Sequence, residues 1–285
     1  MLTKANGKQL QVFSIIGIQL LSIFILWLFF YSPSIFNAIS VEDSILEWGS
    51  FLVWFLGCII LLITFVKLQK SYNVKKITSF FLVGLILVFF ILAMEEVSWF
   101  QRVLGIKRYF FIFRWNQQGE INIHNFATNV SEVIFYFGSF LLMVVLPFLC
   151  ILFCNQYQNY SWHLFIPRPF MIIIGAFACA YNFDMWDIIF IQIAFWGALI
   201  ILLVIFLFSQ KRGDKLLALV SAVILLVSQL SFLLNGQNFI RNIFVITEYK
   251  EFLIGLAALI YALDVSFILE SKLGKNHLTK ESPTI

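Results

Sequence analysis

The sequence predicts an all-α fold, a bundle of about eight transmembrane helices that forms one domain over residues 1–285. Of the 285 residues, 61% are hydrophobic and only 12% are charged, and the mean hydropathy is +0.95. A soluble domain is about half apolar and about a quarter charged, so this chain carries more apolar surface than one water-facing core can hide. The composition excludes soluble enzymes and disulfide scaffolds. We expect the protein to lie in a lipid bilayer. We do not expect it to bind nucleic acid, because the sequence has no basic stripe with interleaved aromatic residues.

Apolar runs of the length that a membrane span needs, about 20 residues, recur along the chain. The fifth run is short, and only Asp184 to Asp187 separate it from the sixth. These two runs can instead form a re-entrant hairpin plus one span, which leaves seven spans as the fallback count. The eight candidate runs are 10–31, 45–68, 77–96, 130–154, 169–184, 186–208, 215–234 and 249–269.

The first run, 10–31, is too long for the core of a cleaved signal peptide, so we expect a retained signal anchor. Lysine and arginine predict the orientation, because they are enriched in cytoplasmic loops. With eight spans and the N-terminus inside, 13 of the 19 lysine and arginine residues face the inside. The chain is therefore expected to be a multi-pass protein of a bacterial cytoplasmic (inner) membrane, with both termini inside.

Acidic residues show the opposite distribution. In this topology, 11 of the 15 aspartate and glutamate residues lie near the outer face. Several of them fall inside the ends of the apolar runs, where a charge is costly. The sequence therefore predicts a polar site at the outer membrane face.

The stretch from Met94 to Arg102 carries the strongest polar signal. Glu95 and Glu96 close an apolar run, and no helix-breaking residue follows before Gly105. We therefore expect the helix to continue, with Glu95, Trp99 and Arg102 on one face. Two interpretations stay open: a helix end whose acids lie in water, or a buried acid pair that binds a cation or moves a proton.

A second polar stretch lies in the long loop that follows. Glu120 and His124 are four residues apart, a spacing that stacks them on a helix. One carboxylate and one imidazole make half of a mixed oxygen and nitrogen metal site. His124 is also the only histidine expected on the outer side, which rules out a site built from histidines alone. The alternative is a hydrogen-bonded or solvent-exposed His124.

Glu47 lies one turn inside the second run, so it can face Glu95 and Glu96 across the bundle. Buried charges are costly unless they are compensated, so we expect these acids to meet one another or a cation. Manganese, iron, zinc or calcium would suit such a ligand set better than copper. The expected site residues are Glu95, Glu96 and His124 as catalytic groups, Trp99, Gln101 and Arg102 as substrate-binding groups, and Glu47, Glu95, Glu96, Glu120 and His124 as ligands of a divalent metal cation.

These motifs resemble a family of uncharacterised bacterial multi-pass membrane proteins. The resemblance rests on Glu-Glu-x-Ser-Trp-x-Gln-Arg at 95–102 and on Asn-x-Gln-Gly-Glu-x-Asn-x-His-Asn at 116–125. It covers about the first half of the chain, and Phe100 stands where the family would have glycine. The resemblance implies a membrane fold and brings no activity. The chain also shows a weaker similarity to alkaline ceramidases. It lacks the paired histidines of those enzymes, so we do not infer their zinc chemistry.

Three functions are compatible with these residues. The first is a membrane enzyme that acts on a lipid or lipid-linked substrate at the outer leaflet, with the carboxylates as acid and base. The second is an ion-coupled transporter that uses the same acids as a cation or proton site. The third is a non-catalytic accessory or scaffold protein that packs laterally against other membrane proteins.

Overall fold

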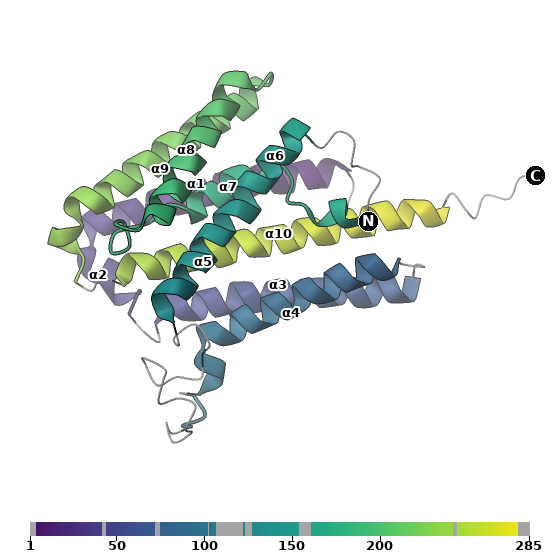
Figure 1. Cartoon of the computed structure of the whole chain (residues 1–285), viewed down its shortest axis with the longest axis horizontal. Coiled ribbons are helices and arrows are strands. Elements are labelled where there is room, and N and C mark those ends of the chain that lie inside the picture. Colours follow the sequence, from purple (N-terminus) through teal and green to yellow (C-terminus); the bar gives the residue numbers. More distant parts are fainter. Residues whose placement is uncertain are drawn as a thin grey trace, which may run out of the picture.

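The computed structural model describes residues 4–41, 44–71, 75–101, 103–106, 122, 127–153, 161–241 and 244–278. Every regular element among them is helical, as the sequence predicts (Figure 1). The elements are α1 (Lys4–Tyr31), α2 (Pro33–Ala38), α3 (Ile45–Ser71), α4 (Lys76–Glu96), the short turn η1 (Ser98–Phe100), α5 (Thr128–Phe140), the π-helical turn η4 (Leu141–Val145), α6 (Leu146–Phe153), η6 (Ser161–Phe165), α7 (Met171–Ala178), α8 (Ile189–Phe208), α9 (Arg212–Phe239) and α10 (Val245–Leu278).

Within the described residues, seven helices are long and apolar enough to cross a membrane, one fewer than the eight candidate runs. Large apolar side chains such as Phe13, Phe80 and Leu234 are exposed on their outer faces. Contact of such apolar surfaces with lipid is favourable, whereas their contact with water is unfavourable. The seven segments are Gly7–Tyr31, Ile45–Lys70, Lys76–Glu96, Val130–Phe153, Ile189–Phe208, Arg212–Phe239 and Val245–Ser271.

The expected span at 169–184 does not form a helix of spanning length. Its helix, α7, has only 8 residues, or about 12 Å at 1.5 Å per residue. The segment still runs along about half of α10: Arg168 bonds to Asp264, whereas Asp184 bonds to Thr247, about 25 Å away along that helix. All residues of α7 are buried, and non-helical backbone at membrane depth is stable only when protein shields it.

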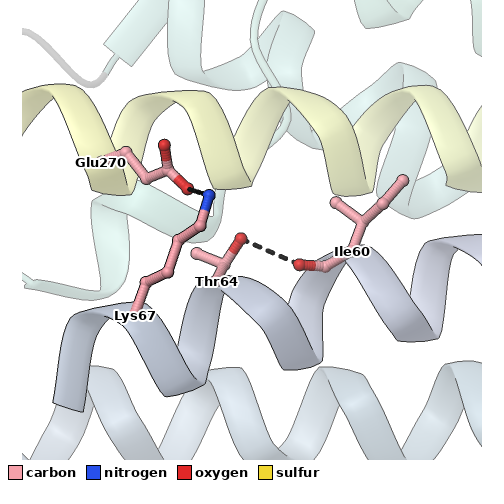
Figure 2. A network of polar contacts seen from close by, with 4 residues as sticks. All are labelled: Ile60, Thr64, Lys67 and Glu270. Carbon is pink, nitrogen blue, oxygen red and sulfur yellow. Dashed lines mark hydrogen bonds and ion pairs between the residues drawn. The ribbon is translucent and has the colours of Figure 1, made fainter. Parts of the chain in front are cut away.

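Helices α3 and α10 lie side by side and run in the same direction (Figure 1). At one end of this pair, Lys67 Nζ lies 3.1 Å from Glu270 Oε1 (Figure 2). Both side chains are exposed, so the ion pair contributes little to stability. The start of α1 lies at this same end, since a Cβ on Gly7 would touch Phe267 of α10. Both ends of the described chain therefore lie on one side of the bundle.

The segment from α5 to α6 is one helix with a π-helical turn in its middle. Pro147 lies just after this turn and has no N–H to donate, which accounts for the local change in hydrogen bonding. The turn packs against α7, where a Cβ on Gly175 would come within 2.6 Å of Met143 Cβ. The close contact therefore requires glycine at position 175.

We expect Gly175→Ala to destabilise the protein by about 1–3 kcal/mol, because the new methyl group would overpack this contact. The matched control is Gly138→Ala in α5, where a Cβ would meet no atom within 4 Å. That change should be neutral or slightly stabilising, since alanine favours a helix over glycine. Thermal unfolding in detergent measures both. Equal effects of the two variants would contradict the packing described here.

Candidate functional site

Acidic side chains from three helices gather at the end of the bundle opposite Lys67 and Glu270. Glu96, the last residue of α4, lies within electrostatic range of Glu47 on α3 and of Glu251 on α10. Glu95 and Glu248 also act on it. We call this end, with its five glutamates, the acidic end. Because like charges repel in a medium of low dielectric constant, this group of carboxylates needs a proton or a cation among its members.

The helix expected to continue past Glu96 ends there instead. The next residues form a left-handed turn, with φ of 45° at Ser98, 54° at Trp99 and 58° at Phe100. The prediction that the helix continues through Ser98 and Trp99, with both on the face of Glu95, is therefore wrong, and Arg102 lies outside the described residues. Trp99 nevertheless returns to the acid pair, because its Nε1 donates to Glu95 Oε1 at 2.8 Å. The turn thus orients one of the two adjacent carboxylates.

Two buried amides hold this turn in place. Asn122 Nδ2 donates to Ser98 Oγ at 3.2 Å, and both residues are buried. Gln101 is also buried, and its Nε2 donates to the carbonyl oxygen of Ile106 at 3.4 Å. Left-handed conformation costs a non-glycine residue roughly 1–2 kcal/mol, and such strain gathers at functional sites. Three such residues in succession therefore make this turn a candidate functional segment.

The structure brings together part of the predicted site. Glu96 lies within electrostatic range of Glu47 and Glu95, and Trp99 bonds to Glu95. A side-chain hydrogen bond of Gln101 goes to the backbone of Ile106. Within the described part of the chain, no three His, Cys, Asp or Glu side chains are placed to hold a metal ion. The predicted ligands and anchors Arg102, Glu120 and His124 lie outside the described residues, so the metal site stays a prediction.

A buried lysine beneath the acidic end was not expected from the sequence. Lys250 lies near the start of the expected run 249–269, and the sequence assigned it no role in the site. In the structure it lies on α10, is 2% exposed and donates from Nζ to Asn182 Oδ1 at 2.5 Å. Asn182 is held in turn by Gln229, whose Nε2 donates to its backbone oxygen at 2.6 Å. The ammonium group also lies 4.2 Å from the ring centroid of Tyr136, whose hydroxyl donates to Glu251 Oε1 at 2.6 Å.

Asp184 lies near Lys250, between the end of α7 and the start of α10. Its carboxylate accepts a hydrogen bond from Thr247 Oγ1 at 3.1 Å, which links the segment after α7 to the start of α10. Burial raises the pKa of Asp184 above its ordinary value, although the bond from Thr247 and the charge of Lys250 act in the opposite direction. Asp184 and Thr247 thus connect two segments that lie 63 residues apart in the sequence.

Further polar side chains lie deeper in the bundle, between α1, α9 and the end of α7. Gln19 Nε2 donates to Ser221 Oγ at 2.8 Å. The hydroxyls of Ser22, Tyr181 and Ser228 are neighbours and fully buried. None of the three makes a hydrogen bond of normal geometry within the described residues. The interior therefore contains polar groups at several depths, which apolar periodicity alone does not reveal.

Comparison of the chain with protein-family models, with curated proteins and with solved structures returns no match. The resemblance to a bacterial membrane family therefore stays a prediction. The functional proposal below therefore rests on the geometry of the acidic end.

The left-handed turn predicts an unusual order of stability at position 100. The Phe100→Gly and Phe100→Ala variants both remove a ring that lies 5.5 Å from that of Phe51. They differ in backbone freedom, so the glycine variant should be more stable by about 1 kcal/mol. At Phe90, inside the right-handed α4, the order should reverse. Thermal unfolding of the four variants measures this, and an alanine variant of equal or higher stability at position 100 would contradict the turn.

Proposed function

We propose that this protein is a membrane-embedded enzyme that acts on the polar part of a lipid or lipid-linked substrate at the acidic end. The observation that carries the proposal is the convergence of Glu47, Glu96 and Glu251, from three helices, beside a strained turn. Helix ends lie at the depth of lipid headgroups, so a substrate can reach this site while its acyl chains stay in the bilayer. Costly buried charges in such a protein favour a function over a purely structural role.

The carboxylates can transfer protons to and from the substrate. Glu96 faces the other acids and makes no hydrogen bond within the described residues, which suits it to act as general acid or base. Glu95 is fixed by Trp99 and would bind or orient the reacting group. The observed contacts of Trp99 and Gln101 go to Glu95 and to the backbone at Ile106, so we assign them positioning roles.

A divalent metal cation suits the charge of the acidic end, because hard cations prefer carboxylate oxygens. The geometry does not match that preference, since no three potential ligands within the described ranges are placed around one point. We therefore derive no step of the reaction through a metal. Its remaining ligands would have to be Glu120 and His124.

A proton- or cation-coupled carrier is the second candidate. It is favoured by the short, fully buried α7 and by the hydroxyls of Ser22, Tyr181 and Ser228 in the bundle interior. Many transporters place their sites where a broken helix ends inside the bundle. The acidic end favours the enzyme, because its carboxylates gather at one end rather than along a path between the two ends.

We also propose that the acidic end faces the outside of a bacterial cytoplasmic membrane. The support is the excess of lysine and arginine at the other end of the bundle, which is typical of cytoplasmic loops. Asp187 and Lys211 are exposed and flank the two ends of α8, so they test this orientation on a single helix.

In a cysteine-free background, Asp187→Cys should react with a membrane-impermeant thiol reagent in intact cells, because its end of α8 faces outward. Lys211→Cys should react only after the cells are opened. Mass-shift labelling followed by gel electrophoresis measures both. Labelling of position 211 alone in intact cells would reverse the orientation.

The enzyme proposal is tested by reconstituting the purified protein into bacterial lipid extract and following the lipids by mass spectrometry. The wild-type protein should convert at least one lipid species, and Glu96→Gln should slow this by about 10²–10⁴-fold, since it removes proton transfer. Lys67→Met, which breaks only the exposed pair at the opposite end, should retain full activity. Unchanged lipid composition with every variant would contradict an enzyme of lipids.

A further inference from the structure

Lys250 is a buried cation that the proposed acid–base chemistry does not use. It lies five residues after the start of α10, about 8 Å along the helix axis, and is 2% exposed. Because the ends of membrane helices reach the headgroup region, we expect its ammonium to lie near the depth of lipid phosphates. The side chain is therefore within reach of a headgroup that enters the acidic end.

The ammonium of Lys250 has an incomplete set of partners. It carries three N–H donors, and its one observed hydrogen bond goes to Asn182 Oδ1 at 2.5 Å. Within the described residues, no carboxylate lies at ion-pair distance from it. Its ammonium also lies over the face of Tyr136, whose hydroxyl donates to Glu251.

This arrangement is costly unless a further acceptor joins it. A buried charge without a direct counter-ion costs several kcal/mol, and the acids that act on Lys250, among them Asp184 and Glu132, do so from beyond contact. Neutral Asn182 supplies a single oxygen, and the Tyr136 ring supplies a weaker attraction. The remaining donors therefore require an acceptor that brings negative charge with it.

We propose that Lys250 binds the phosphate of a phospholipid or of a phosphate-linked lipid, and so selects the substrate of the acidic end. A lysine ammonium is a common point-charge ligand for phosphate. The phosphate would occupy the free donors while the group to be transformed faces Glu96. This assignment rests on the proposed enzyme function, since it names the substrate class of that same site.

Asn182→Asp is the most informative variant. The carboxylate of an aspartate would pair directly with Lys250 and compete with a phosphate. The backbone of residue 182 would still donate to Gln229 Oε1, now 2.9 Å away, and accept from Gln229 Nε2. The variant gives up the bond from Asn182 Nδ2 to the carbonyl oxygen of Cys179 at 3.0 Å, so its unfolding temperature without ligand is measured first. It keeps both bonds to Gln229, and it should lose phosphate binding. Lys250→Met removes the ligand itself, and Lys67→Met is the matched lysine control at the opposite end.

The experiment follows thermal unfolding of the full-length protein in dodecyl maltoside with three probes: phosphatidylglycerol, a diacylglycerol glycolipid without phosphate, and inorganic phosphate. Phosphatidylglycerol should raise the unfolding temperature of the wild-type and Lys67→Met proteins more than the glycolipid does. Asn182→Asp and Lys250→Met should weaken its apparent affinity about tenfold or more.

Equal binding of phosphatidylglycerol by wild-type and Asn182→Asp proteins would overturn the proposal, as would equal stabilisation by the glycolipid. If inorganic phosphate alone gave the full shift, the ligand would be a soluble phosphate and the lipid assignment would be overturned. If Lys250→Met fails to fold, the binding of phosphatidylglycerol by Asn182→Asp alone tests the proposal. Phospholipid binding without any lipid conversion would contradict the enzyme and leave this site intact, so the two proposals can fail separately.

Discussion

Burying charge in an apolar bundle is costly, and this cost explains the polar contacts between the helices. Each ionised side chain in such an interior needs a partner, a proton or a cation. The chain meets this requirement mainly along α10. Asp264 pairs with Arg168 just past the middle of this helix, while Glu251 bonds to Tyr136 and Lys250 to Asn182 near its start. Helix α10 therefore organises both polar regions, and the neighbouring helices supply its partners.

The same constraint explains the segment that contains α7. A complete helix in this position would leave Asn182 no backbone groups to offer Gln229, whose side chain bonds to both the N–H and the carbonyl of that residue. Ending α7 inside the bundle frees those groups and directs the side chain of Asn182 toward Lys250. The unwound residues are stable because α1, α8, α9 and α10 shield them from lipid.

Sequence reasoning predicted the all-helical membrane fold because composition and run length depend on the bilayer alone. It also brought Glu47 and the Glu95–Glu96 pair to one end, because topology fixes which helix ends meet. It failed at Ser98–Phe100, since no glycine or proline there indicates a left-handed turn. The glycine expected from the family resemblance at position 100 was the available signal. Lys250 was missed because a lysine at the start of an apolar run resembles a loop residue.

The claim that carboxylates converge at the acidic end can be tested by measuring the electrostatic coupling between Glu47 on α3 and Glu96 on α4. Glu47→Gln, Glu96→Gln and the double variant form a cycle whose unfolding free energies can be measured at neutral pH. Because the two carboxylates repel each other, the double variant should depart from additivity by about 0.5–3 kcal/mol. The pair Glu47→Gln and Glu270→Gln, at opposite ends of the bundle, should be additive. Additivity in both cycles would contradict a shared site at the acidic end.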